Sequence, residues 1–200
     1  MRRVFLMLYL AALGASGLAA QATGMPLYNA PYRAFQRSEI GGAVSFPSSA
    51  GTAFLGMYRM ASGKLDLGFQ AGIWTPSCTG CKSVFLAGVE ARDRVITHNA
   101  DFPLDGAVVV GVGGEFVSGA NVLVIPAGLT LGRRVQLQGT SISMVPYVQP
   151  TLFILAGNAS GTKFGLGLGA DFRFTPRLDG RFSAGLGDVD GVSLGLVWLH

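Results

Sequence analysis

The last forty residues of the chain alternate apolar residues with small or polar ones, and this pattern constrains the fold more than any other feature. From Thr162 to Phe174 every second residue is apolar, and the residues between them are mainly glycine, aspartate and arginine. The alternation resumes in Gly180–Gly187 and again in Gly191–His200. A period of two places successive side chains on opposite faces of a β-strand. Three such strands joined by short turns predict the closing hairpins of a transmembrane β-barrel.

Seven earlier segments are predicted to be strands as well, which makes ten in all. They are Ser38–Phe46, Gly51–Met60, Lys64–Trp74, Lys82–Arg92, Asp105–Val117, Asn121–Leu131 and Ser143–Leu155. A tilted strand that crosses a membrane needs roughly 9–11 residues. Residues 135–141 fit either a turn or a strand extension, and the long connection is predicted at 93–104. The sequence therefore predicts an all-β fold, a transmembrane antiparallel up-and-down β-barrel of ten strands, with eight strands as the alternative.

The chain is apolar overall, but no segment after the predicted signal peptide could form a membrane-spanning helix. Charged residues make up 13% of the chain, about half the ~25% of an average protein, and mean hydropathy is +0.45. Beyond residue 22 no apolar run approaches the roughly 18 residues of a spanning helix. In lipid, only helices and closed barrels satisfy their backbone polar groups. The composition favours a membrane barrel, and a soluble secreted β-barrel or sandwich stays open as an alternative.

The N-terminus has the features of an export signal. Arg2 and Arg3 precede an apolar stretch, and Ala20-Gln21-Ala22 fits a cleavage site between small residues. We predict a cleaved signal peptide at 1–22, an irregular lead-in or plug-like arm at 23–37, and a barrel domain at 38–200. The formal net charge is +4, but the sequence has no Lys/Arg cluster long enough to follow a phosphate backbone. No nucleic-acid partner is therefore expected.

The less apolar face of the strands carries glycine and scattered charge. In the third segment Leu65, Leu67 and Phe69 alternate with Asp66 and Gly68. In a small barrel this second face points inward, where acids and bases have to pair. The predicted interior charge network consists of Asp66, Glu90, Arg92, Glu115, Asp171, Arg173 and Arg181. The 30 glycines are expected to relieve crowding and to permit curvature.

Two local motifs suggest chemistry. Cys78 and Cys81 are predicted to form a loop disulfide in an oxidising compartment. The alternatives are a redox dithiol, although no helix pattern follows it, and half of a zinc site, although the histidines lack ligand spacing. His98 lies near Asp101 in the long connection, but no G-x-S-x-G sequence accompanies it. No catalytic, metal or cofactor site is therefore predicted.

Six aromatic residues are candidates for belts at the two membrane surfaces. They are Tyr58, Phe69, Trp74, Tyr147, Phe153 and Trp198.

The stretch from Phe164 to Leu178 resembles the strand–turn pattern of small bacterial outer-membrane β-barrel proteins, the OmpA-like and opacity-protein-like group. It has a glycine-rich strand, the aromatic–Arg–aromatic step at Phe172–Phe174 and a short polar turn. Val192, Leu194, Leu196 and Trp198 are similar to part of that group's C-terminal assembly signal. The resemblance implies a bacterial outer-membrane location, outer-membrane lipid around the barrel and assembly by the barrel-assembly machinery.

The function expected from these patterns is a structural or surface-interaction role for a monomeric barrel with a filled or very narrow interior. A barrel of eight to ten strands leaves room for little beyond its own side chains. The alternatives are a narrow channel and a lipid-binding or lipid-modifying outer-membrane barrel.

Overall fold

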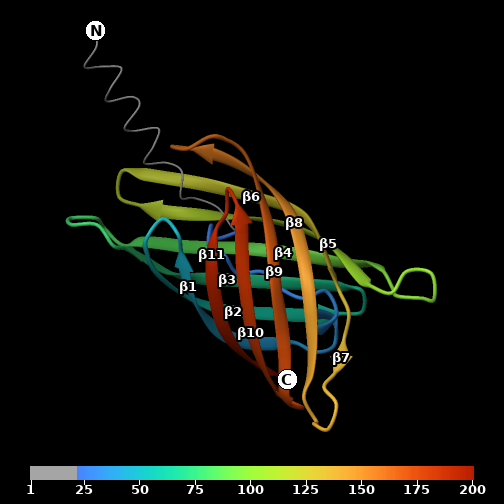
Figure 1. The fold of residues 1–200 in the computed structure, drawn as a ribbon. Coiled ribbons are helices and arrows are strands. Elements are labelled where there is room, and N and C mark those ends of the chain that lie inside the picture. Colours follow the sequence, from blue (N-terminus) through green and yellow to red (C-terminus); the bar gives the residue numbers. More distant parts are fainter. Residues whose placement is uncertain (1–21) are drawn as a thin grey trace.

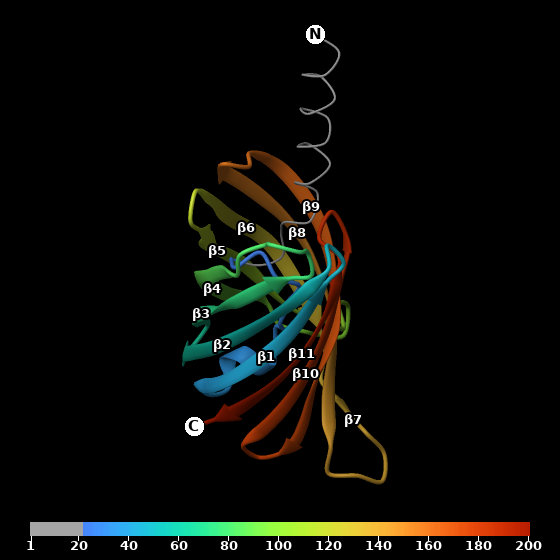
Figure 2. The ribbon, with the colours of Figure 1, turned by 90° about the vertical axis from the view of Figure 1, so that its left-hand side faces the viewer.

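The computed structural model describes residues 22–200, and ten of its strands form a closed ring (Figures 1 and 2). Residues 1–21, which hold nearly all of the predicted signal peptide, lie outside the described residues. The strands of the ring are β1 (Glu39–Pro47), β2 (Gly51–Ser62), β3 (Leu65–Pro76), β4 (Val84–Ile96), β5 (Asp105–Val117), β6 (Ala120–Gly132), β8 (Ser143–Gly157), β9 (Gly161–Thr175), β10 (Leu178–Gly187) and β11 (Gly191–Leu199). The 3₁₀ turn η1 (Arg33–Phe35) precedes them, and β7 (Val135–Gln136) is a short strand between β6 and β8.

All pairings in the ring are antiparallel, and the ring closes where β1 pairs with β11. Elsewhere each strand pairs with its neighbours in sequence, with β6 pairing directly with β8. The prediction of an all-β antiparallel barrel is confirmed, with ten strands and not eight. Among residues 22–200, no helix is both long and apolar enough to cross a membrane.

The predicted strand ends differ most from the structure at β4. The prediction ended this strand at Arg92, but it continues to Ile96 and the connection shortens to residues 97–104. Asp93 and Arg94 continue the ladder by pairing with Val108 and Ala107 of β5. Residues 135–141 were expected to form either a turn or a strand extension, and they contain both. The short strand β7 comes first, and a turn that projects from the ring follows it (Figure 2).

The outer face of the ring is apolar over the middle of every strand. On β3 the exposed residues are the predicted ones, among them Leu67, Phe69 and Ile73. Among the outward positions that the described register defines, the single charged residue is Asp93, close to one end of β4. Outward polar residues lie at or near strand ends, at Thr52, Ser62, Thr75, Asn121 and Thr162.

An aromatic belt requires outward side chains, and only part of the predicted set meets this requirement. Tyr58, Phe69 and Trp198 are exposed on the outer face. The expectation is wrong for Tyr147 and Phe153, which are buried inside the ring, and for Trp74, which packs partly buried against an interior cluster. Composition alone could not separate these two groups, because each strand contributes side chains to both faces.

Residues 22–38, which we call the N-terminal segment, precede β1, and the first part of this segment runs inside the ring (Figure 2). Every residue from Ala22 to Pro31 is buried. Met25 and Leu27 pack against side chains of β2, β4 and β11, and Tyr28 and Ala30 pack against those of β6 and β8. The two larger apolar clusters of the interior thus both include this segment.

Candidate functional site

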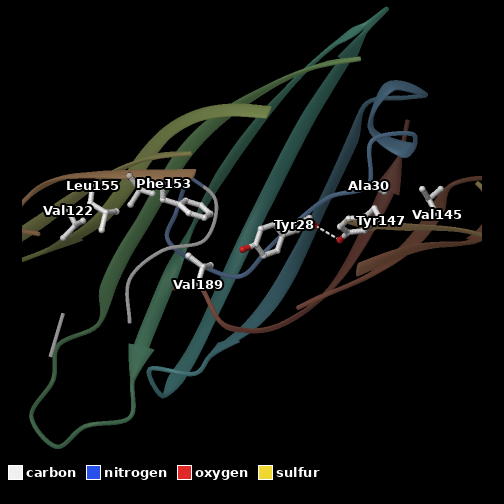
Figure 3. Packing of buried hydrophobic residues seen from close by; sticks show 9 residues of the cluster. Tyr28, Ala30, Val122, Val145, Tyr147, Phe153, Leu155 and Val189 are labelled. Carbon is white, nitrogen blue, oxygen red and sulfur yellow. Dashed lines mark hydrogen bonds between the residues drawn. The ribbon is translucent and has the colours of Figure 1, made fainter. Parts of the chain in front are cut away.

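Tyr28 and Tyr147 lie in the barrel interior (Figure 3), and the glycine run of β9 makes room for their rings. A Cβ atom on Gly167 would lie 2.3 Å from Cδ1 of Tyr28, and one on Gly169 would lie 2.3 Å from the Tyr147 hydroxyl. With contacts this short, any side chain at these positions would force the tyrosine rings or the backbone to shift. The glycines therefore receive particular rings, a more specific role than the general relief of crowding that was predicted.

Inward polar side chains of the barrel bind the backbone of the N-terminal segment. The Tyr147 hydroxyl donates a hydrogen bond to the Tyr28 carbonyl at 2.9 Å, as Figure 3 shows. Ser183 donates to the Pro26 carbonyl at 3.1 Å, and Thr130 donates to the Asn29 carbonyl at 3.1 Å. A buried irregular segment needs such partners, because its carbonyls lack a ladder of their own. The segment is thus held by shape and by hydrogen bonds.

Closer to the start of β1, the interior changes from apolar to charged. Arg59 donates from Nε to Asp66 at 3.0 Å and from Nη2 to Glu90 at 2.6 Å. Arg92 contacts the same two acids, at 3.4 Å from Asp66 and 3.8 Å from Glu90. It also donates a hydrogen bond to the Ala30 carbonyl at 3.3 Å, which connects the charges to the N-terminal segment.

Glu39, the first residue of β1, joins these charges to a second set across the closing strands. Both of its carboxylate oxygens accept hydrogen bonds from Arg181, each at 2.7 Å. Its Oε1 atom also lies 3.8 Å from Nε of Arg59. Arg181 in turn lies 3.3 Å from Asp171. We call the seven residues Glu39, Arg59, Asp66, Glu90, Arg92, Asp171 and Arg181 the charge layer, and all seven are buried.

A smaller ion group anchors the end of the N-terminal segment. Arg173 forms a two-pronged pair with Asp179 at 2.9 and 3.0 Å, and Arg33 lies 3.9 Å from the same carboxylate. Arg33 also donates hydrogen bonds to the Ser143 carbonyl at 2.7 Å and hydroxyl at 2.9 Å. Burial lowers the pKa of the Arg33 guanidinium to about 10, so the group is still charged at neutral pH.

The structure brings together five residues of the predicted charge network and separates two. Asp66, Glu90, Arg92, Asp171 and Arg181 all belong to the charge layer. Arg173 lies in the smaller group with Asp179. Glu115 is buried farther along the barrel, where its carboxylate lies against Gly24. Its position follows from the length of β5, which carries it away from the level of Glu90.

Sequence reasoning missed two members of the charge layer, Glu39 and Arg59, and also Asp179. Arg59 follows Leu55 and Met57 on the inward positions of β2, so the alternation that identified the other residues could have found it. Glu39 could have been found in the same way on β1. Asp179 comes just before the predicted strand Gly180–Gly187, whereas β10 begins at Leu178 and turns this carboxylate inward.

The other candidate residues lie in connecting loops. Cys78 and Cys81 form the predicted disulfide, in the β3–β4 connection. His98 pairs with Asp105 at 3.0 Å and not with Asp101, whose backbone N–H donates to Asn99. Within the part of the chain that the structure describes, no group of three or more His, Cys, Asp or Glu residues is placed to hold a metal ion.

No family model and no curated protein matches this sequence. Among solved structures, the chain is similar to a de novo designed transmembrane β-barrel, with 13% identity, a TM-score of 0.40, and coverage of 86% of this chain and 97% of that one. It is also similar to the β domain of the Bordetella autotransporter Brka, with 14% identity, a TM-score of 0.39, and coverage of 85% and 77%. Identities this low concern the fold alone, so functional conclusions rest on the residues of this chain.

Proposed function

We propose that the chain is an integral β-barrel of the bacterial outer membrane, with a structural or surface-interaction role and an interior closed by its own N-terminal segment. The observation that carries this proposal is the distribution of charge between the two faces of the ring. The charge layer is buried inside, while large apolar side chains are exposed on all ten strands.

This distribution is the reverse of the arrangement that water favours. In a protein surrounded by water, charged residues are almost never fully buried, and large exposed apolar patches are rare. Here outward polar residues gather at strand ends and the middle of each strand is apolar. That is the pattern of a barrel whose outer wall contacts lipid and whose rims contact headgroups and water.

The contents of the interior favour a closed barrel over a diffusion pore. Residues 22–31 are buried within the ring, and both larger apolar clusters include them. Arg33 lies 3.9 Å from Asp179, and Arg92 donates to the Ala30 carbonyl, so both arginines connect this segment to the charged groups of the strands. The proposal includes no catalytic role, and it takes the barrel to be a monomer that the barrel-assembly machinery inserts.

Export by a signal peptide that ends near Ala22 belongs to the same proposal. Ala22 is fully buried and lies close to Gly88, Gly111 and Gly113 of the barrel wall. A peptidase could not reach this position in the closed barrel, so cleavage has to precede folding. N-terminal sequencing of the protein from the membrane fraction checks this step, and an uncleaved N-terminus on the folded barrel would contradict it.

The test of membrane insertion is heat-modifiability after cell fractionation. We expect the protein in the outer-membrane fraction, with different gel mobilities for unheated and boiled samples because a closed barrel resists detergent at room temperature. A protein that fractionates with the periplasm and shows no shift would refute the membrane proposal. The outer face would then have to be covered by something other than lipid.

Conductance in planar bilayers tests whether the interior is closed. We expect no steady current from the wild-type chain under conditions in which insertion is established. A stable current of a narrow channel would favour the channel alternative, and it would show that the N-terminal segment leaves a path for solutes.

A further inference from the structure

A long apolar groove lies on the outer wall of the barrel, across the strands that close the ring. Its volume is about 1050 Å³. Outward residues with little or no side chain form its floor at Gly42, Gly56, Ala71 and Gly180. Gly42 pairs directly with Gly56, and Gly56 pairs with Ala71, so these three residues form one continuous row, and Leu196 separates it from Gly180. Phe54 and Phe182 are among the large side chains that flank the row.

The register carries this groove to the end of the barrel where β1 begins. Gly42 is also paired with Leu196, Leu196 with Gly180, and Gly180 with Phe172. Phe172 and Phe174 are close to the last residue of β9, and they stack on each other at the groove's end. The groove thus begins in the middle of the wall and reaches the rim.

At that rim Phe174 also lines a second, polar hollow of about 420 Å³. We call it the rim hollow, and its lining includes Arg37, Arg134 and Arg173 but no carboxylate. Arg173 is paired with Asp179, whereas Arg37 and Arg134 are exposed. The rim hollow therefore has an excess of positive charge.

A buried arginine behind the rim hollow adds to this excess. Arg33 is fully buried and donates to Ser143, which lines the hollow. Two of its nitrogens, Nε and Nη1, have no hydrogen-bond partner among the described residues. Buried donors of this kind are usually satisfied, so Arg33 has donors to spare close to Ser143 and the hollow.

We propose that the outer groove and the rim hollow together bind one anionic phospholipid of the surrounding membrane. An acyl chain lies along the row of small residues, and the phosphate lies against Arg37 and Arg134. This inference rests on the proposed function, since lipid is the partner of the outer wall only in a membrane. The two hollows meet at a strand end, which is the level at which a headgroup joins its chains.

The test is native mass spectrometry of the full-length protein in detergent micelles, with phosphatidylglycerol and phosphatidylcholine of matched acyl chains. We expect the anionic lipid to bind more tightly. The double variant Arg37→Gln/Arg134→Gln should lose about thirtyfold in affinity for phosphatidylglycerol, at about fivefold for each arginine. The matched control is Lys64→Gln/Arg133→Gln, which removes two exposed charges that do not line the hollow and should change little.

The acyl chain is tested by filling the groove. Nothing lies closer than 3.7 Å to a Cβ atom on Gly56, so Gly56→Leu is expected to fold and to project into the groove. Gly56→Leu should weaken the binding of both lipids, whereas Ala127→Leu on the outer face of β6 should weaken the binding of neither.

Three results would overturn the inference. They are equal binding of the two lipids, equal effects of the test and control variants, and displacement by inorganic phosphate with no effect of Gly56→Leu, which would identify a free-anion site. Heat-modifiability of the same samples separates these outcomes from failure of the proposed function. A folded barrel without lipid preference contradicts only the inference, whereas a protein without a mobility shift contradicts both.

Discussion

The two halves of the barrel interior solve the same packing problem by different means. Around Tyr28 the wall is glycine-rich, and the N-terminal segment fits by shape and by single hydrogen bonds to its carbonyls. Around Glu39 the wall carries seven buried charges in mutual contact. Added side-chain volume should therefore destabilise the half around Tyr28, and a change of charge should destabilise the half around Glu39.

The difference teaches where this barrel is vulnerable. A buried ion pair contributes little net stability over an apolar replacement, but removal of one partner leaves an uncompensated charge at high cost. Crowding a packed aromatic side chain costs less stability, because the neighbouring side chains can shift in part. Isosteric changes should therefore cost more in the charged half than small steric changes cost in the apolar half.

The largest effect is expected from Glu39→Gln. This change leaves Arg59 and Arg181 without the carboxylate that lies between them and should destabilise the barrel by about 3–5 kcal/mol. Urea unfolding in detergent micelles, followed by the fluorescence of the two tryptophans, measures the loss. Lys64→Gln at an exposed turn is the control and should stay within about 0.5 kcal/mol. Equal values for the two variants would show that the charge layer is not a connected unit.

The next effect is expected from Gly167→Ala. Its new methyl group would meet the Tyr28 ring at 2.3 Å and should cost about 1–3 kcal/mol. Gly56→Ala, which meets nothing closer than 3.7 Å, is the steric control. In a Tyr28→Leu background the cost of Gly167→Ala should shrink, as a double-mutant cycle measures. An unchanged cost in that background would mean that the clash involves some other group.

A smaller effect is expected from Tyr147→Phe. It removes the hydrogen bond to the Tyr28 carbonyl and should cost about 1 kcal/mol in the same unfolding assay. Tyr58→Phe on the outer face serves as the comparison, because Tyr58 is exposed. If both variants lose the same stability, the hydroxyl of Tyr147 does not hold the N-terminal segment.

The smallest effect is expected from Glu115→Gln, made as the isosteric partner of Glu39→Gln. Glu115 lies outside the charge layer, and the positive charge that acts on its carboxylate is that of half-buried Lys163. Every arginine of the charge layer keeps its carboxylate partners after this change, so the free energy of unfolding should shift by less than about 1 kcal/mol. A loss as large as that of Glu39→Gln would erase the contrast between the two halves.

Much of this arrangement could be read from the sequence, because strand faces are set locally. The alternation around Leu67 and Phe69 gave the outward face of β3, and the same rule turned Asp66 inward. The Cys78–Cys81 pairing was equally local, since only two residues separate the cysteines. The rule was less reliable at strand ends, where Asp179 was left out of the predicted strand, because hydrogen bonding to the neighbouring strand decides where a strand begins and ends.

The sequence by itself determined that this chain forms β-strands with an apolar face and a glycine-rich, charged face, and it favoured a barrel of ten strands over one of eight. The sequence left open whether residues 23–37 form a lead-in or a plug-like arm. Only the tertiary structure decided that residues 22–31 are buried within the ring, that Tyr28 meets Gly167, and that Glu39 lies between Arg59 and Arg181. The physical reason is distance along the chain. A period of two is a property of neighbouring residues, whereas contacts across the interior depend on how β1 and β11 close the ring.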